Sequence, residues 1–251
     1  MAFVEYEKRG HVAIVTLNRP ERLNAMGRDL NRELREAEND FAEDDSAWVL
    51  IYTAVGRAFS AGLDLRDRVA RQDGTVTDDR PIPPAIEITK PRIAAVNGLC
   101  YDAAFEMTQR MDIRICSDVA TFAMPEVKIG VVPPTGIFFL PRIIGRSDAL
   151  WMMMIGAPID AQAALRMGLV SRMVSPEELL PAAIEMAELI CANGPSAVRL
   201  VKKLVQLTSE VPLECGQKIA SAEISAIWAS DDSREGMRAF IEKRSPSWTG
   251  H

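Results

Sequence analysis

The feature that most restricts the fold of this chain is an alternation, in its first half, between short β-branched runs and helical periodicity. The apolar runs that predict strands are HVAIVTL (11–17), WVLIYTA (48–54), RIAAVNG (92–98), DIRICS (112–117) and TFAMP (121–125). The first three are apolar over nearly their whole length, which is typical of mostly buried strands. The segment 24–45 has apolar residues at helical spacing on a charged background. Strands that alternate with helices indicate an α/β fold.

The second half of the chain, from about residue 147 onward, predicts helices almost exclusively. Ser175 is typical of a helix N-cap, because Pro176 stands at the first helical position and Glu178 where the capping-box partner belongs. Gly194 ends this helix, and further helical segments cover 195–210, 212–232 and 233–244. We therefore divide the chain into a core, residues 1–195, and a C-terminal helical region, residues 196–251. The polar, proline-rich stretch 71–84 is expected to be mobile.

Composition and charge exclude several classes of protein. With 48% of its 251 residues hydrophobic, the chain can bury a large core. No apolar stretch approaches the roughly 18 residues that span a bilayer, and we expect no membrane contact. The net charge is −6 without a basic run, which argues against a nucleic-acid-binding face. The four cysteines show no C-x-x-C spacing, so we expect a reduced, cytoplasmic protein.

The histidine count narrows the chemistry further. The only two histidines are His11, at the start of a predicted strand, and His251, the last residue. Nucleophilic catalysis by a Ser-His-Asp or Cys-His arrangement needs a histidine in the site, and imidazole-rich metal centres are equally hard to build. If the chain is an enzyme, carboxylates and backbone groups carry its chemistry, and no metal is expected.

Two predicted strand-to-helix turns have the composition of sites that bind a developing negative charge. They are VGRAFSAGLDL (55–65) and NGLCYDAAFE (97–106), and in each the chain leaves a buried strand through small residues. Free N–H groups in such turns can face one cleft, where two of them form an oxyanion hole. Each turn taken alone is better explained as an ordinary tight turn that needs small residues.

Two glutamates follow these turns along the sequence. Glu106 ends the stretch NGLCYDAAFE, in the predicted first turn of the following helix. Glu126 lies in TFAMPEVKIGVVPP. Two carboxylates at the mouth of one cleft could share a water molecule and move protons in opposite directions. The alternative is that both are solvated surface residues, as most of the 35 acidic residues must be.

Taken together, these motifs resemble the crotonase superfamily, the enoyl-CoA hydratases and isomerases, over essentially the whole chain. The matching stretches, in order, are VAIVTLNRPERLNAM, GRAFSAGLDL, AAVNG, Glu106, MDIRICSDVATFAMPEVKIGVVP, GLVSRMV and EGMRAFIEKRSPSW. The resemblance implies a spiral of repeated ββα units with a helical C-terminal part used for trimerisation, and trimers that pair into hexamers. It also implies an acyl-CoA substrate and no separate cofactor, because CoA is part of the substrate.

The same resemblance assigns catalytic roles. The thioester carbonyl would lie between the backbone N–H groups of Leu63 and Ala103, the oxyanion hole. Glu106 and Glu126 would hold the water, one taking a proton from it while the other supplies the α-proton. Isomerases of the family need only the glutamate that matches Glu126, so the presence of both favours a hydratase of the kind used in fatty acid metabolism.

Residues implied for binding the CoA part of the substrate lie in three stretches. They are Arg22, Leu23, Ala25, Ala58, Ala61, Leu63, Asp64, Leu65, Phe240 and Lys243. Phe240 and Lys243 would reach the nucleotide from a neighbouring subunit. The alternatives are core packing for Phe240 and solvated charges for Arg22 and Lys243.

The sequence departs from the family pattern at two places. Asp102-Ala103-Ala104 replaces a glycine run, so a positive φ there would be costly; we expect the Asp102 carboxylate to cap the following helix. For Tyr101, core packing is the simplest expectation. Pro133-Pro134-Thr135-Gly136 stands where a Gly-rich segment is usual, and Pro134 has no N–H to offer a water molecule.

The second departure also bears on the acyl group. Ile137, Phe138 and Phe139 add bulk close to Pro134, which favours a branched, cyclic or aromatic acyl group over a short straight chain. The leading hypothesis from sequence is an enoyl-CoA hydratase. The alternatives are an enoyl-CoA isomerase, a hydrolase of a cyclic or 1,3-dicarbonyl acyl-CoA, and a non-catalytic acyl-CoA binder.

Overall fold

A computed structural model describes residues 2–75, 82–84, 86–208 and 211–250 of the chain. Its larger sheet has six strands in the order β1-β2-β3-β5-β7-β10. Their bounds are Val4–Arg9 (β1), Val12–Leu17 (β2), Val49–Ala54 (β3), Arg92–Val96 (β5), Ile113–Ser117 (β7) and Arg172–Val174 (β10). Only β1 is antiparallel to its neighbour. Strands β2, β3 and β5 are almost wholly apolar because helices or the second sheet cover both of their faces.

Short strands form a second sheet beside the first, in the order β4-β6-β8-β9. Their bounds are Ala58–Ser60 (β4), Leu99–Tyr101 (β6), Thr121–Ala123 (β8) and Ile159–Asp160 (β9). Each long strand β3, β5 and β7 is followed by the short strand β4, β6 or β8, and then by a helix. These helices are α2 (Leu65–Gln72), α3 (Asp102–Gln109) and the 3-10 helix η2 (Pro125–Ile129). The chain is therefore a spiral of repeated ββα units, as the resemblance implied.

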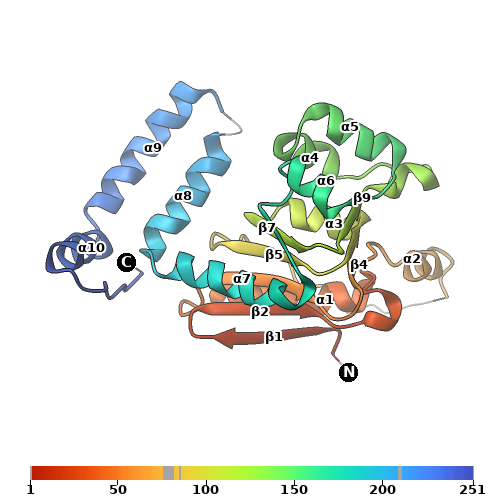
Figure 1. Cartoon of the computed structure of the whole chain (residues 1–251), viewed down its shortest axis with the longest axis horizontal. Helices are drawn as coiled ribbons and strands as arrows, with labels where there is room; N and C mark the ends of the chain where they lie inside the picture. Colours follow the sequence, from red (N-terminus) through yellow and green to blue (C-terminus); the bar gives the residue numbers. More distant parts are fainter. Residues whose placement is uncertain (1, 76–81, 85, 209–210, 251) are drawn as a thin grey trace.

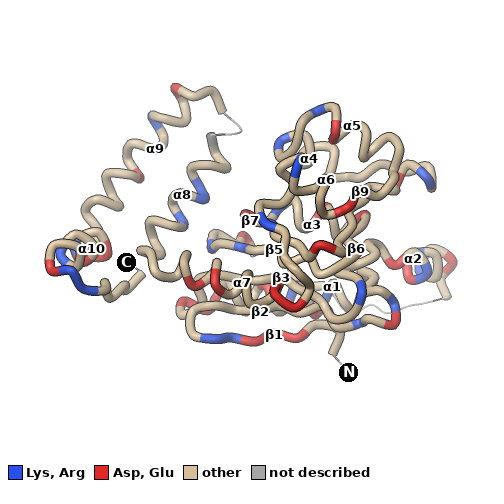
Figure 2. Tube along the Cα trace, in the orientation of Figure 1, with Lys and Arg blue, Asp and Glu red and all other residues tan. Residues whose placement is uncertain are grey.

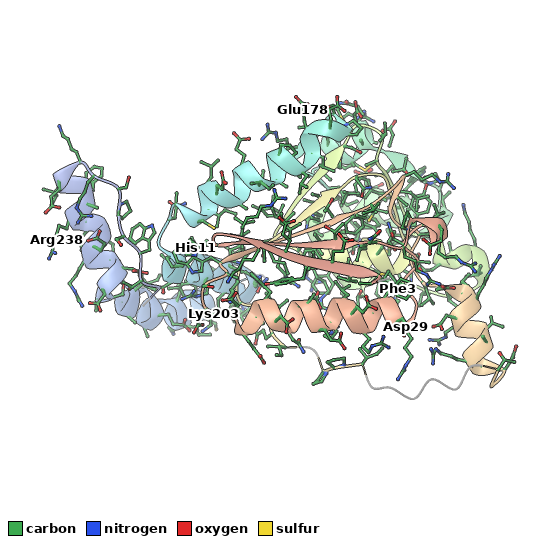
Figure 3. All side chains as sticks on the ribbon, turned by 90° about the horizontal axis from the view of Figure 1, so that it is seen from below. Phe3, His11, Asp29, Glu178, Lys203 and Arg238 are labelled. Atoms are coloured by element: carbon green, nitrogen blue, oxygen red, sulfur yellow. The ribbon has the colours of Figure 1, made fainter. Side chains whose placement is uncertain are left out.

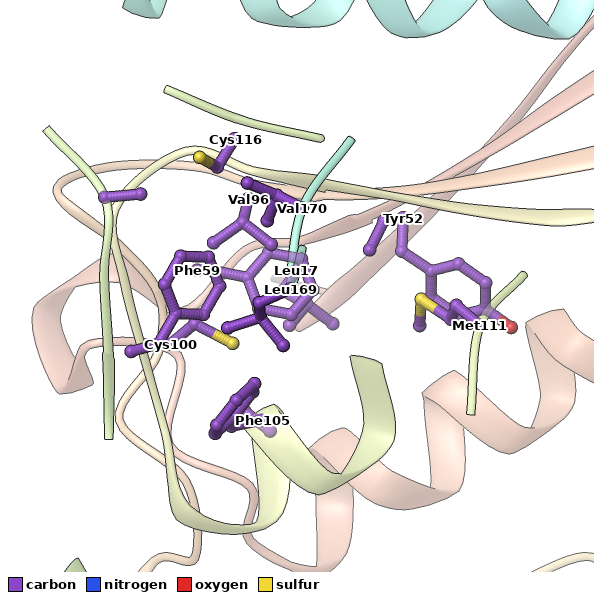
Figure 4. Packing of buried hydrophobic residues seen from close by; sticks show 14 of the residues in the cluster. Leu17, Tyr52, Phe59, Val96, Cys100, Phe105, Met111, Cys116, Leu169 and Val170 are labelled. Carbon is purple, nitrogen blue, oxygen red and sulfur yellow. The ribbon is translucent and has the colours of Figure 1, made fainter. Parts of the chain in front are cut away.

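The main core fills the space between the two sheets. Figure 4 shows Phe59 of β4, Cys100 of β6 and Phe105 of α3 packed with Leu17 and Val96 of the larger sheet, all of them buried. Side chains alternate between the two faces of a strand, so the middle residue of each three-residue strand, Phe59 in β4 and Cys100 in β6, points into this core. The core thereby fixes the positions at which β4 and β6 end.

Two long helices cover opposite faces of the larger sheet. Helix α1 (Arg28–Glu43) packs Leu30, Leu34 and Phe41 into the main core, while α7 (Pro176–Cys191) lies on the opposite face (Figure 1). The side chains of α7 that meet the sheet are Leu179, Ala182, Ala183 and Ala187. Helices α4 (Gly136–Ile143), α5 (Arg146–Ile155) and α6 (Ala161–Arg166) follow η2 and lie together on the far side of the second sheet.

The C-terminal helices extend from the core as an arm, which we define as residues 195–250. It contains α8 (Pro195–Thr208), α9 (Leu213–Trp228) and α10 (Asp231–Glu242). Figure 1 shows α9 and α10 well away from the sheets, and Figure 3 shows Arg238 of α10 at the opposite end of the molecule from Phe3. Lys202 of α8 ties the arm to the core: its ammonium donates to the carbonyls of residues 88 and 90 and pairs with Asp112 at 2.9 Å.

The predicted elements agree with the structure except at their ends. The five predicted strands are β2, β3, β5, β7 and β8, but RIAAVNG ends as a strand at Val96 and TFAMP at Ala123, where Pro125 starts η2. The capping box is confirmed, because the Glu178 carboxylate accepts from both the N–H and the hydroxyl of Ser175. Of the stretch expected to be mobile, residues 76–81 lie outside the described part. The division at residue 195 stays a prediction.

Charge is spread over the whole molecule. Figure 2 shows basic and acidic positions interspersed along the chain. Within the described ranges, no helix is both long enough and apolar enough to cross a membrane.

Candidate active site

The turn after β4 presents one backbone donor to the second sheet. Ser60 accepts a hydrogen bond from the N–H of Gly62 at 3.1 Å, and the Gly62 carbonyl accepts one from the N–H of Met26 at 2.7 Å. The C=O and N–H of one peptide unit point in opposite directions. Because Met26 fixes the Gly62 carbonyl, the N–H of Leu63 must point away from Met26, toward β6 and α3.

The turn after β6 lies directly against this donor. Strands β4 and β6 pair in parallel, with Ser60 opposite Cys100, so their ends lie side by side. Ala103 stands in the first turn of α3, where N–H groups have no carbonyl partner within the helix. The structure thus brings the two predicted turns, with Leu63 and Ala103, to the same edge of the second sheet.

Gly62 is required by the closeness of the two turns. A Cβ atom at this position would lie 2.4 Å from the Cβ of Asp102 and 2.7 Å from the carbonyl oxygen of Tyr101. Its φ of +89° is also one that other residues rarely adopt. Only glycine allows the chain to bring Leu63 so near the start of α3.

Asp102 does not act as the expected helix cap. It is the first residue of α3, with a φ of +52°, and its carboxylate accepts a hydrogen bond from the N–H of Leu63 at 2.6 Å. The cap position is held by Tyr101, which has no capping side-chain bond; its hydroxyl instead lies 3.1 Å from that of Thr121. The capping prediction is therefore wrong, because the neighbouring turn offers the carboxylate a closer donor.

Glu106 lies one helical turn beyond Asp102 and is 7% exposed, so the surface alternative is wrong for it. Its Oε1 accepts hydrogen bonds from the N–H groups of Thr135 at 2.7 Å and Gly136 at 2.6 Å, at the start of α4. Pro134 precedes these donors and has no N–H of its own. Two donors on one oxygen fix the orientation of this carboxyl group.

Glu126, in η2, has the opposite environment. It is 4% exposed, and neither of its carboxyl oxygens has a hydrogen-bond partner. Burial, together with the negative charges of Asp102 and Glu106, raises its pKa to about 7. The surface alternative is wrong here as well, and a buried carboxyl group without donors is suited to carry a proton near neutral pH.

The residues expected to bind CoA at the N-terminal side lie in two segments that the structure joins. Asn24 is fully buried and donates to the carbonyls of Val55 and Ala58, while the N–H of Ala61 donates to the carbonyl of Leu23. Arg22 ends the 3-10 helix η1 (Pro20–Arg22), and Ala25 follows in the same loop. This joins Arg22, Leu23 and Ala25 to the segment with Ala58 and Ala61.

Two further predicted residues follow the donor turn directly. Asp64 is the N-cap of α2, accepting from the N–H of Asp67, and also pairs with Arg19 at 3.1 Å. Leu65 is the first residue of α2 and is exposed.

Phe240 and Lys243 are not brought to this site within one chain. Both belong to the α10 end of the arm, and Phe240 is 85% exposed. Core packing, the alternative for Phe240, is therefore wrong. Within the described ranges, no group of three histidine, cysteine, aspartate or glutamate residues is arranged to hold a metal ion.

Sequence reasoning missed several groups of the site because they act through the backbone. The donors to Glu106 are peptide N–H groups of Thr135 and Gly136, and Met26 orients Leu63 through its own N–H. Side-chain identity carries no signal for such groups.

Comparisons with known proteins agree over the whole chain. The family model described as enoyl-CoA hydratase/isomerase matches residues 7–251. The carnitinyl-CoA dehydratase of Proteus mirabilis is 36% identical over 255 residues, which cover 96% of this chain and 96% of that protein. A solved enoyl-CoA hydratase/isomerase from Mycobacterium paratuberculosis has 35% identity and a TM-score of 0.90, with 99% of both chains covered. The enoyl-CoA hydratase of Mycobacterium tuberculosis has 32% identity and a TM-score of 0.91 over 100% of both chains.

Proposed function

The chain belongs to the enoyl-CoA hydratase/isomerase family, and on that premise we propose that it is an enoyl-CoA hydratase. It adds water across the α,β double bond of an acyl-CoA thioester. The observation that carries this proposal is the pairing of Glu106 and Glu126 in one site, since the family resemblance implies both for hydration and only the second for isomerisation. CoA enters as part of the substrate, and no other cofactor takes part.

The thioester oxygen is bound by the N–H groups of Leu63 and Ala103. Attack of water on the β-carbon moves electrons onto this oxygen, as an enolate. Each donor aimed at such an oxygen contributes about 3–4 kcal/mol in comparable sites. The orientation of the Leu63 amide by Met26 supports this role, because a donor fixed in advance needs no rearrangement during the reaction.

The two glutamates take different parts in proton transfer. Glu106, oriented by two backbone donors, takes a proton from the water as its oxygen bonds to the β-carbon. Glu126, whose pKa is raised to about 7, gives its proton to the α-carbon of the enolate. Both groups act on the same face of the substrate, so the addition is syn.

The reverse reaction uses the same groups. One relative is named a carnitinyl-CoA dehydratase, and this site run in reverse would remove water from a β-hydroxyacyl-CoA. The bulk of Ile137, Phe138 and Phe139 near Pro134 favours a branched, cyclic or aromatic acyl group. The roles of Glu106 and Glu126 are the same in both directions of the reaction and for each of these acyl groups.

The functional unit is a homotrimer or a hexamer made of two trimers. The exposure of Phe240 and Ile241 on α10, at 85% and 79%, supports an arm that contacts other subunits. In this assembly, Phe240 and Lys243 reach the CoA nucleotide bound by a neighbour.

The test uses crotonyl-CoA as the enoyl thioester. The protein should remove its ultraviolet absorbance and give a product one water molecule heavier by mass spectrometry. The E106Q and E126Q variants should each lose this activity, while the control E185Q, whose side chain is 63% exposed on α7, should keep it.

Other outcomes identify the alternatives. Full turnover by E106Q would contradict the two-glutamate mechanism and favour an isomerase. A wider panel of β-hydroxy and β-keto thioesters detects a hydrolase by cleavage, and binding without turnover on the whole panel would indicate a non-catalytic binder.

A further inference from the structure

The donor proposed for the thioester oxygen is already occupied in this structure. The N–H of Leu63 donates to Oδ2 of Asp102 at 2.6 Å. Met26 holds the same peptide from its other side, so this N–H has a fixed direction. A ligand oxygen and the Asp102 carboxylate therefore compete for a single position.

The placement of Asp102 is not that of a helix cap or of a surface charge. Its φ of +52° is a left-handed conformation that costs a residue with a Cβ, although aspartate tolerates it better than most. The contact also depends on the missing Cβ of Gly62, which leaves room for the Asp102 side chain. Two unusual backbone positions thus combine to bring one carboxylate onto one amide.

The surroundings of Asp102 offer its carboxylate a second partner. Glu126 is close enough for the charge of Asp102 to raise its pKa, and both oxygens of Glu126 lack a hydrogen-bond partner. When Glu126 carries its proton, it can donate to a carboxylate that has left Leu63.

Resting on the proposed function, we propose that Asp102 gates the oxyanion hole: its carboxylate holds the place of the thioester oxygen in the free enzyme, and acyl-CoA binds by displacing it. A hydrogen bond to a charged group changes an equilibrium constant by about 10- to 100-fold. A neutral thioester oxygen must overcome this competition, whereas an oxygen that becomes negative does so more readily. The gate therefore weakens ground-state binding of the thioester group while leaving contacts of the CoA part unchanged.

The experiment compares butyryl-CoA, which has a thioester carbonyl but no double bond, with free CoA, which has none. Both dissociation constants are measured by calorimetry on the full chain in its native assembly, for the natural sequence, D102N and D102G. Asparagine tolerates the left-handed backbone as aspartate does, so D102N tests the gate even if D102G fails to fold. The matched control is D160N. Asp160 ends strand β9, and its carboxylate likewise accepts a hydrogen bond from a backbone N–H, that of Ala163 at the start of α6.

The gate predicts that D102G binds butyryl-CoA at least about tenfold more tightly, that D102N shows a smaller gain, and that free CoA binds all proteins equally. D160N should behave as the natural chain. Unchanged or weaker butyryl-CoA binding in folded D102N and D102G would overturn the proposal, because it would make Asp102 only a structural contact.

The kinetics of crotonyl-CoA hydration separate this proposal from the proposed function. If the natural chain hydrates crotonyl-CoA but D102N and D102G bind butyryl-CoA no more tightly, the proposed function is supported and the gate is wrong. Hydration that occurs only in D102G supports the gate and contradicts hydration by the natural chain. If none of the proteins binds any acyl-CoA, both proposals are wrong.

Discussion

At the scale of single residues, Glu106 and Glu126 place the same functional group in two unlike environments. One carboxyl oxygen of Glu106 accepts two backbone hydrogen bonds, while Glu126 is buried and neither of its carboxyl oxygens accepts one. Pairs of titratable groups whose surroundings differ in this way suit opposite roles in proton transfer. This contrast leads to two predictions about pH.

The first concerns turnover. Since Glu126 must carry a proton to act as the acid, kcat for hydration should be highest below its pKa of about 7 and fall about tenfold per pH unit above it. The measurement is a pH profile with crotonyl-CoA at saturation. A kcat that rises with pH through this range would assign Glu126 the role of a base and contradict the mechanism.

The second concerns stability. Because burial raises the pKa of Glu126 in the folded state, the fold favours its protonated form. As pH rises from the unfolded value toward about 7, the unfolded chain ionises first, so the folded state loses stability. Thermal melts at about pH 4 and about pH 8, on either side of the range from the unfolded pKa to about 7, should therefore show E126Q gaining stability relative to the natural chain at the higher pH. An equal difference at both values would contradict the shift.

The limit of sequence reasoning at this scale is illustrated by Asp102. Its identity and its position before Ala103 were visible, but its partner, Leu63, lies 39 residues away along the chain. Local rules assign such a carboxylate to the nearest helix N-terminus, and only the pairing of β4 with β6 shows the closer donor.

At the scale of secondary-structure elements, the site is made where short strands end. The long strands were predicted because β-branched runs mark buried parallel strands. The three-residue strands β4 and β6 lie in segments that the sequence predicts as turns, since three residues carry too little periodicity to identify a strand. Their pairing is nevertheless what brings the two turns together.

This arrangement predicts a large effect of G62A. The added Cβ would collide with Asp102 and with the Tyr101 carbonyl, separating the turns, so hydration should fall by orders of magnitude and the protein should lose at least about 1–2 kcal/mol of stability. The control is G10A, a glycine with a similar positive φ and no atom within 4 Å of the added Cβ. It should lose comparable backbone free energy and keep kcat. Equal losses of activity in both variants would refute the close-approach argument.

At the scale of the whole molecule, the arm leaves apolar side chains in solvent that a single chain does not cover. Sequence reasoning found its helices, because their apolar periodicity is clear. It could not decide between core packing and an external role for Phe240, since an amphipathic helix buries its apolar face equally well in its own chain or in another. Exposure in the structure excludes the core.

The proposed contact with CoA across subunits predicts the behaviour of F240A. This variant should raise KM for crotonyl-CoA about tenfold, because an aromatic ring stacked on a base contributes about 1–3 kcal/mol. It should leave KM for crotonyl-pantetheine unchanged, because that substrate lacks the nucleotide. Equal effects on both substrates would place Phe240 elsewhere, and light scattering of both proteins controls for the oligomeric state.

The central claim is that two amides, from Leu63 and Ala103, bind one thioester oxygen beside Glu106 and Glu126. A crystal structure with a bound unreactive acyl-CoA measures this directly. We predict that the carbonyl oxygen lies about 2.7–3.1 Å from both amide nitrogens, with Asp102 displaced from Leu63. A carbonyl oxygen bound away from these amides, with the Asp102 carboxylate still on Leu63, would contradict the account.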